Sequence, residues 1–251
     1  MSIILTALKL PRSTYYHWKE HRSSQHECVD VKLKDRIRSI WQNNYKAYGY
    51  PRITMALQSL GIKIGAKRVF RLMREMGIHS LMNRRFKKPG THVDYSQRPN
   101  FVKRYPEASV WRTDITYLEL RPGTWVYLSS VYEPRAHRVL AFKISRQMDA
   151  KLVVNTLNQA LENFKKPDFI HSDMGSQYTS NEVETLLERH QIAHSYSKQG
   201  YPYDNSQIES FHSLLKREFV FQTHFSSFED LVVRTSNYIN WFNTKRIRTA
   251  V

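Results

Sequence analysis

The chain has 251 residues, enough for two domains, and 41% of them are hydrophobic, which is sufficient to form a core. It carries 39 Lys and Arg against 22 Asp and Glu, giving a formal net charge of +17. The single cysteine, Cys28, excludes an intrachain disulfide and a four-cysteine metal site. The apolar start MSIILTALKL is too short to cross a bilayer and lacks a cleavage site, so we expect a cytoplasmic protein without membrane segments.

The positive charge is concentrated in the first part of the chain. Residues 1–105 contain 22 basic and 6 acidic residues, whereas residues 106–251 contain 17 and 16. Such a basic segment predicts binding to a polyanion such as DNA. The alternative interpretation is a solubilising surface.

Helical periodicity dominates the N-terminal region. We expect an N-terminal helical segment over residues 1–28 and a unit of three helices within residues 29–80. The third helix, at about residues 66–76, has one apolar side and one basic side, which is typical of a DNA-reading helix-turn-helix. Its predicted DNA contacts are Lys67, Arg68, Arg71 and Arg74. A solvated helix face is the alternative.

Residues 81–105 contain many breakers and basic residues and show no sustained period, so we expect an interdomain linker. Four of its basic residues are predicted to follow DNA phosphates: Arg84, Arg85, Lys87 and Lys88. A plain extended tether is the alternative.

From residue 106 the pattern changes to strands. Strand-like runs at 110–120, 125–131 and 138–145 should form an antiparallel meander. A helix at about 150–164, a strand ending at Asp173, a helix at 181–190 and a strand at 193–196 follow. The order predicts an α/β domain over residues 106–251, with a mixed five-stranded sheet and a closing helix.

Three carboxylates in this domain have settings that suggest metal binding. Asp114 lies in the middle of an expected strand, and an ionised side chain there needs a cation or several hydrogen bonds. Asp173 ends a buried strand, and Glu209 lies in the first turns of an expected helix. Their oxygen atoms suit Mg²⁺ or Mn²⁺.

These residues belong to segments that resemble a known family. WRTDITYL, HSDMGSQYTS and DNSQIESFHSLLKRE are similar to the catalytic core of OrfB-type insertion-sequence transposases, which belong to the retroviral-integrase superfamily. Asp173 and Glu209 are separated by 35 residues, and Lys216 follows Glu209 by seven positions, as in that family's Asp-Asp-35-Glu signature. YGYPRITMAL and KRVFRLMREMGI also resemble the family's helix-turn-helix segment.

The resemblance implies a ribonuclease-H-like integrase core with Asp114, Asp173 and Glu209 as catalytic residues that hold two Mg²⁺ or Mn²⁺ ions. It implies metal-dependent cleavage and transfer of DNA strands at the ends of an insertion sequence. The partners implied are double-stranded DNA, an OrfA protein or OrfA-fused copies, and further copies of the chain. Further residues expected to hold the DNA end are Lys216, Lys198, Gln177 and Tyr178. For Tyr178, core packing is an equal alternative.

Some features depart from the family pattern. Glu133 stands where relatives usually have Asp, Ala141 near the place of a Gly, and Phe242 in the Tyr position of the closing YNxxR segment. Relatives usually continue beyond the position of Val251, so a truncated element copy is also considered. The main alternative function is a catalytically silent DNA-binding relative that represses transposition; a metal-dependent nuclease on the same fold is a second.

Overall fold

The computed structural model of the chain describes residues 11, 13, 25–82, 99–197 and 202–248. It contains two compact units, a helical unit that ends at Leu81 and a sheet unit from Met82 to Arg248. Most of the N-terminal segment expected over residues 1–28 lies outside the described residues, as do residues 83–98 of the expected linker.

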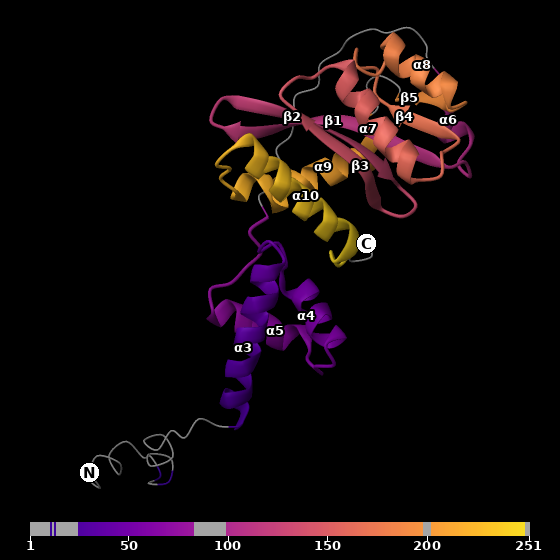
Figure 1. Cartoon of the computed structure of the whole chain (residues 1–251). Helices are drawn as coiled ribbons and strands as arrows, with labels where there is room; N and C mark the ends of the chain where they lie inside the picture. The colour runs from indigo at the N-terminus through magenta and orange to yellow at the C-terminus, as the bar shows by residue number, and fades with distance from the viewer. Residues whose placement is uncertain (1–10, 12, 14–24, 83–98, 198–201, 249–251) are drawn as a thin grey trace. The chain divides into compact units, whose positions relative to one another are not determined.

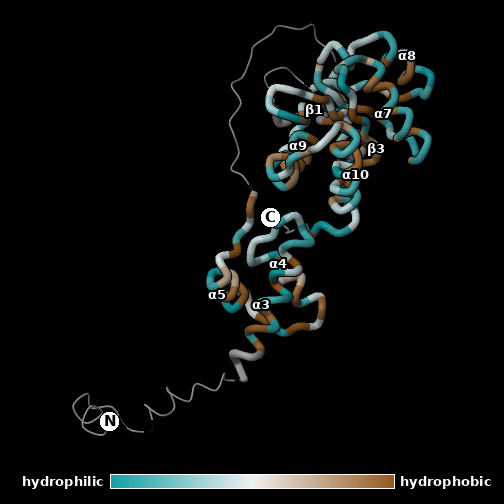
Figure 2. Tube along the Cα trace, turned by 60° about the vertical axis from the view of Figure 1, so that its left-hand side comes forward, coloured by the Kyte–Doolittle hydropathy of each residue, from teal (hydrophilic) through white to brown (hydrophobic). Residues whose placement is uncertain are grey.

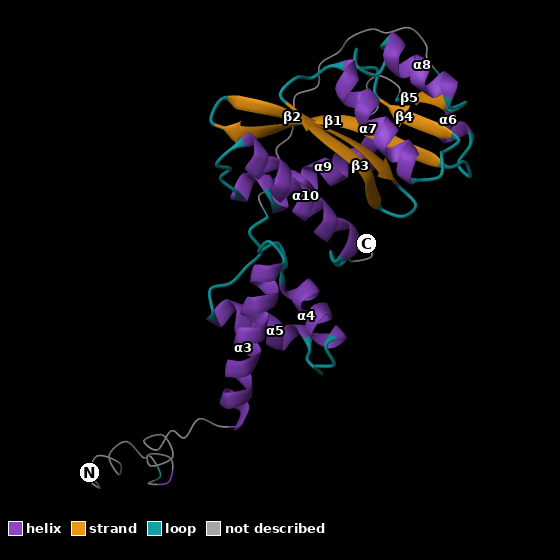
Figure 3. Ribbon diagram, in the orientation of Figure 1, coloured by secondary structure: helices purple, strands orange, loops and turns teal. Residues whose placement is uncertain are grey.

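Three helices form the described part of the helical unit (Figures 1 and 3): α3 (Gln25–Asn43), α4 (Tyr50–Ser59) and α5 (Ala66–Glu75). Pro51 stands in the first turn of α4, where its missing N–H costs no helical hydrogen bond. Gly61 and Gly77 follow α4 and α5 with φ of +79° and +66°, a conformation that glycine adopts without strain. The fully buried residues of this unit's core include Ile37, Ile53, Leu57, Val69 and Leu72. The three helices expected from the sequence are confirmed.

The sheet unit contains a five-stranded sheet with the strand order β3-β2-β1-β4-β5. Its strands are β1 (Val110–Arg121), β2 (Thr124–Glu133), β3 (Arg138–Ser145), β4 (Phe169–Ser172) and β5 (Ala193–Tyr196). β1, β2 and β3 pair antiparallel, whereas β4 pairs parallel with both β1 and β5. The sheet is therefore mixed, and the expected meander followed by two further strands is confirmed.

Helices cover both faces of this sheet (Figures 1 and 3). They are α7 (Ala150–Asn163), α8 (Asn181–Arg189), α9 (Ser206–Glu218) and α10 (Phe228–Thr244), with the short α6 (Phe101–Arg104) and the 3-10 turns η1 (Pro202–Asn205) and η2 (Val220–Gln222). Hydrophilic and hydrophobic residues alternate along α7 and α10, so each helix is amphipathic (Figure 2).

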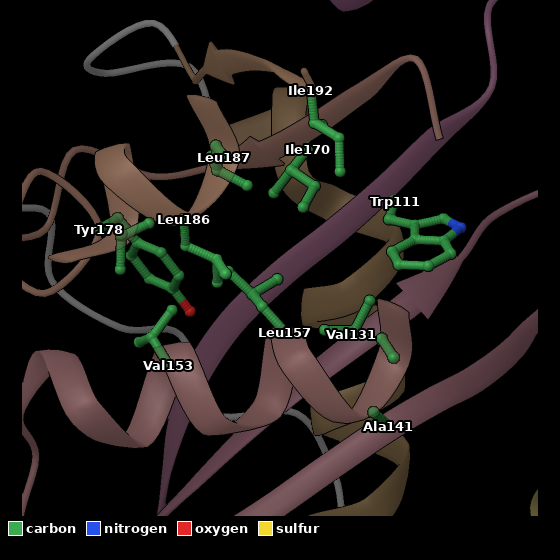
Figure 4. Close-up of a cluster of buried hydrophobic side chains, with 12 residues drawn as sticks. Trp111, Val131, Ala141, Val153, Leu157, Ile170, Tyr178, Leu186, Leu187 and Ile192 are labelled. Atoms are coloured by element: carbon green, nitrogen blue, oxygen red, sulfur yellow. The ribbon is translucent and has the colours of Figure 1, made fainter. Parts of the chain in front are cut away.

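The alternation of side chains along β2 separates the two layers. Val131 points to the cluster that α7 and α8 cover, where Trp111, Leu157 and Leu187 are also buried (Figure 4). Its neighbour Ser130 points the opposite way and contacts α9. The face of the sheet toward α9 thus carries polar groups as well as apolar ones.

The last residues of the expected linker pack against the sheet unit. The carbonyl of Pro99 accepts a hydrogen bond of 2.9 Å from the N–H of Tyr196, and the N–H of Phe101 donates to Ser195 Oγ at 2.9 Å. The ring of Phe101 stacks on Phe169 with centroids 5.4 Å apart. Residues 99–105 therefore extend the sheet unit beyond the boundary at residue 106 that the sequence suggested.

Candidate active site

Asp114 lies on the face of the sheet that α9 covers. Its Oδ1 accepts a hydrogen bond of 2.9 Å from the N–H of Ile115, and its Oδ2 lies 3.2 Å from His212 Nδ1 on α9. The side chain is 21% exposed. The mid-strand carboxylate therefore has hydrogen-bond partners and still reaches solvent.

Asp173 follows β4, the strand beside β1. The parallel register pairs Arg112 with His171, and two further residues along each strand bring Asp173 level with Asp114. Partial burial raises the pKa of Asp173 above the usual value for an aspartate, and the negative charge of Asp114 raises it further. The N–H of Gly175, which donates to Asp173 Oδ1 at 2.9 Å, lowers it.

Asp173 keeps an exposed surface, and the charge of Asp114 adds to the effect of burial on its pKa. Gly175 is also needed for space. A Cβ at this position would stand 3.0 Å from Asp173 Oδ1 and 3.3 Å from Gln177 Oε1. A larger residue would therefore crowd the Asp173 carboxylate.

Glu209 is exposed in the first turn of α9. The start of this helix is fixed to β1, because Asn205 Nδ2 donates to the carbonyl of Thr113 at 3.3 Å and Arg112 donates to the carbonyl of Asp204. Asn100 Nδ2 donates to Asp204 Oδ2 at 2.7 Å. These bonds hold the first turn of α9 beside the segment that carries Asp114.

The sequence predicts that all three carboxylates meet, and the structure has Asp114 on β1, Asp173 directly after β4 and Glu209 on α9. Among the described residues, no three His, Cys, Asp or Glu side chains gather closely enough to hold one metal ion. Asp114 and Asp173 interact, and their charges repel each other. Because a bound cation would relieve this repulsion and carboxylate oxygens are the ligands that Mg²⁺ and Mn²⁺ prefer, the residues present fit such an ion.

His212 is a residue of this site that the sequence analysis did not single out. It lies three residues after Glu209, so both side chains project from neighbouring positions of the same helix. Its ring is buried and contacts both Asp114 and Ser130. The helical spacing from Glu209 was the available signal, but only the pairing of α9 with β1 gives this histidine a carboxylate partner.

The segments of the chain match known domain families. Residues 29–86 match an HTH-like domain, and residues 104–202 and 190–251 match two integrase core domain models. The transposase for insertion sequence element IS904 of Lactococcus lactis is 31% identical over 240 residues, which are 92% of this chain and 94% of that protein. The chain belongs to the insertion-sequence transposases.

Two further relatives of this transposase come from Escherichia coli. The putative transposase InsK of IS150 is 31% identical over 97% of this chain and 87% of its own length, and the transposase InsF of IS3A is 31% identical over 92% and 83%. Among solved structures, the catalytic core domain of BIV integrase shares 17% identity, with a TM-score of 0.45 over 56% of this chain and 87% of that domain. The family matches confirm the resemblance expected from the sequence, and the integrase core match together with the mixed five-stranded sheet confirms the expected fold class.

Two of the predicted DNA contacts in the helical unit of this transposase also have partners within that unit. Arg68 and Arg71 both bind Asp30 on α3, with N–O distances of 2.6 and 2.7 Å, and Arg71 also binds Glu75 at 2.7 Å. Lys67 and Arg74 are exposed on α5. The two arginines thus join α5 to α3, because Asp30 binds both of them, while Arg71 is also exposed like Lys67 and Arg74.

Tyr178 also has a different role from the predicted one. Its ring is 2% exposed, it belongs to the buried cluster beside α7 (Figure 4), and its hydroxyl lies 3.4 Å from Thr113 Oγ1. Burial raises its pKa well above the usual value for a tyrosine, with a further contribution from the charge of Asp114. Tyr178 is therefore a core residue, and the prediction that it contacts DNA is wrong for this structure.

The remaining predicted contacts are placed as follows. Gln177 is half-buried, with its Nε2 3.4 Å from the carbonyl of Met148, and Lys216 is half-buried in the last turn of α9. The other predicted contacts lie outside the described residues: Lys198, Arg84, Arg85, Lys87 and Lys88. Within the described part of the chain, no helix is both long and apolar enough to span a membrane.

Proposed function

We propose that the chain cleaves DNA strands at the ends of an insertion sequence and transfers them to a new site, with Asp114, Asp173 and Glu209 as catalytic residues. The observation that carries the proposal is that Asp114 on β1 and Asp173, directly after the adjacent parallel strand β4, lie close enough for the charge of Asp114 to raise the pKa of Asp173. A carboxylate pKa raised by a neighbouring acid is common at functional sites. The bonds of Asn205 and Arg112, which hold the helix of Glu209 beside β1, support Glu209 as the third acid.

The three carboxylates would hold two Mg²⁺ or Mn²⁺ ions. Such ions, when bound, activate the attacking oxygen and neutralise charge at the phosphate. The residues of the chain provide the arrangement: β1 and β4 fix the two aspartates, and Gly175 leaves room beside Asp173. The reaction requires water to cut one phosphodiester and the freed 3′-hydroxyl to attack another.

The helical unit and Lys216 would bind the DNA. The HTH-like domain implies double-stranded DNA as a partner, and the exposed Lys67 and Arg74 on α5 have the charge that DNA phosphates attract. Lys216 follows Glu209 by two helical turns, so it would contact a phosphate on the same side of α9.

The active form is proposed to contain several copies of the chain and an OrfA partner. One relative supports the proposal that an OrfA partner takes part. The probable transposase of IS1353 of Shigella flexneri is 31% identical over 99% of this chain but over only 49% of its own length. About half of that relative therefore lies outside the similarity.

The test is Mn²⁺-dependent nicking of supercoiled plasmid DNA, which requires no knowledge of the element's ends. We expect the wild-type chain to nick and Glu209→Gln and Asp114→Asn to lose this activity. Glu188→Gln is the matched control, because Glu188 is also an exposed helical glutamate but lies on α8. Equal nicking by wild type and Glu209→Gln would refute the proposed site. DNA binding without nicking by every form would favour the alternative, a silent DNA-binding relative.

A further inference from the structure

A buried chain of hydrogen-bonding groups leads from β2 through α9 to Asp114. Ser130 Oγ lies 2.7 Å from His212 Nε2, and His212 Nδ1 lies 3.2 Å from Asp114 Oδ2. Ser130 is 0% exposed and His212 is 4% exposed. Ser130 is also the residue directly opposite Asp114 in the β1–β2 register. Both nitrogens of the histidine ring therefore have partners on the sheet.

The chemistry of the carboxylate fixes the direction of the contact with His212. An ionised carboxylate only accepts hydrogen bonds, so Nδ1 of His212 carries a proton and donates it to Asp114. The hydroxyl of Ser130 can rotate to satisfy Nε2. His212 thus acts as a bridge that orients Asp114, and Ser130 holds the other edge of the ring.

Asp114 depends on this bridge for its orientation. Its Oδ1 accepts from the N–H of Ile115, the next residue in the same strand, at 2.9 Å. His212 is the contact that comes from another element. Without it, the remaining bond to the neighbouring backbone leaves the far oxygen less fixed. Side chains that hold a metal ligand in this way are known to affect metal affinity strongly.

The same contact also links two of the proposed catalytic carboxylates. Glu209 precedes His212 by three residues on α9, so a bond that joins His212 to Asp114 also sets the position of the first turns of α9 relative to β1. The hydrogen bonds of Asn205 and Arg112 hold the residues that precede α9 to β1, whereas His212 holds the helix itself.

We propose that His212 is a positioning residue that holds the carboxylate of Asp114 in the orientation needed to bind a divalent cation. The inference rests on the proposed function of the Asp114 site. His212 acts through Asp114 and contacts neither DNA nor the cation. The opposing interpretation is a purely structural histidine, packed beside Phe211 at 5.4 Å between ring centroids, whose loss would change stability alone.

Two substitutions separate these interpretations. His212→Asn keeps an N–H donor close to the place of Nδ1 and gives up the contact with Ser130. His212→Phe keeps the volume of a ring and removes both hydrogen bonds. The full-length chain is used, Mn²⁺ alone is the probe, and free Mn²⁺ is measured by electron paramagnetic resonance. Urea unfolding of each variant reports its stability.

We expect His212→Phe to weaken Mn²⁺ binding by about 10-fold or more, the usual effect of losing such a supporting contact. His212→Asn should lose much less Mn²⁺ affinity than His212→Phe, because it keeps the donor to Asp114. The Mn²⁺ concentration for half-maximal nicking should move in parallel, while the affinity for plasmid DNA stays unchanged. Unchanged Mn²⁺ binding in His212→Phe, or equal losses in both variants, would overturn the proposal.

One control and one replacement variant complete the test. Asp114→Asn should lose Mn²⁺ binding; if it binds like wild type, the proposed metal site itself fails. If Asp114→Asn loses binding and His212→Phe keeps it, the positioning role alone fails. Should His212→Phe not fold, Ser130→Ala takes its place, since it frees the far edge of the ring. A several-fold loss of Mn²⁺ affinity is expected for Ser130→Ala, and an unchanged affinity refutes the role of the bridge.

Discussion

The ion pair between Glu218 and Arg246 fixes the end of α9 to the end of α10, and its loss should strongly destabilise the sheet unit. Glu218 is 1% exposed and accepts hydrogen bonds from Arg246 Nε at 3.0 Å, from an Arg246 terminal nitrogen at 2.7 Å and from Tyr238 Oη at 2.8 Å. Arg246→Met removes two of these three bonds and leaves a buried carboxylate without its cation.

Removal of one partner from a buried pair costs about 3–5 kcal/mol. We therefore expect Arg246→Met to lower the free energy of unfolding by about that amount, measured by urea unfolding with tryptophan fluorescence, since Trp111 and Trp241 are buried in the sheet unit. The double variant Glu218→Gln/Arg246→Met should recover part of the loss, because it buries no unpaired charge. A loss of less than about 1 kcal/mol in the single variant, or no recovery in the double variant, would refute this reasoning.

Three other predictions concern acid stability, DNA binding and the core. Burial and the nearby Arg112 charge lower the pKa of His171 to about 3, so the folded form resists its protonation. The free energy of unfolding should therefore be highest above pH about 6.5, the pKa of histidine in the unfolded chain, and should fall as the pH drops toward 3. At pH 5 the wild type should have lost about 2 kcal/mol in this way, and His171→Gln should not show this loss in urea unfolding. If the free energy of unfolding depends on pH equally in both proteins, the low pKa of His171 is contradicted. The double variant Lys67→Ala/Arg74→Ala should reduce the slope of log binding constant for DNA against log salt concentration by about 2. Arg71→Ala should change this slope little, and equal effects per residue would contradict the ion-paired role of Arg71. Tyr178→Ala should lower the free energy of unfolding by about 3–5 kcal/mol, and a change within 0.5 kcal/mol would place Tyr178 outside the core.

The ends of helices and strands were largely predictable from the sequence because they depend on local patterns. The three helices of the helical unit were predicted from the helical spacing of apolar residues and from the glycines after α4 and α5. The five strands were predicted from runs of β-branched residues. The spacing of Asp173 and Glu209 carried the resemblance to transposases, which the relatives confirm. These features depend on residues that are close together along the chain, so they can be predicted from a single sequence.

The contacts of the YNxxR segment could not be predicted from local sequence patterns. Phe242 stands in its first position and packs on Phe211 with centroids 5.0 Å apart, while Asn243 bonds both the N–H and the carbonyl of Val139 on β3 at 3.0 and 2.8 Å. Arg246 pairs with the buried Glu218. The motif was visible in the sequence, but its partners lie on other elements, far away along the chain.

Partners of charged residues were decided by the tertiary structure alone. Four basic residues of α5 looked equivalent by helical spacing, yet Asp30, roughly forty positions earlier on α3, forms ion pairs with Arg68 and Arg71. Tyr178 looked like a surface contact within a polar motif, but the chain after β4 turns its ring into the core. Periodicity gives the side of a helix or strand on which a residue lies, and only packing tells what that side meets.

The candidate site combines both kinds of information. The residue types and spacing of Asp114, Asp173 and Glu209 come from the sequence, whereas their setting comes from the parallel pairing of β1 with β4 and from the bonds that hold α9 beside β1. His212 received a carboxylate partner only through that arrangement. A sequence determines which groups are available and where each element begins and ends. The fold determines which charges lie close together, because electrostatic and hydrogen-bond energies depend on distance in space and not along the chain.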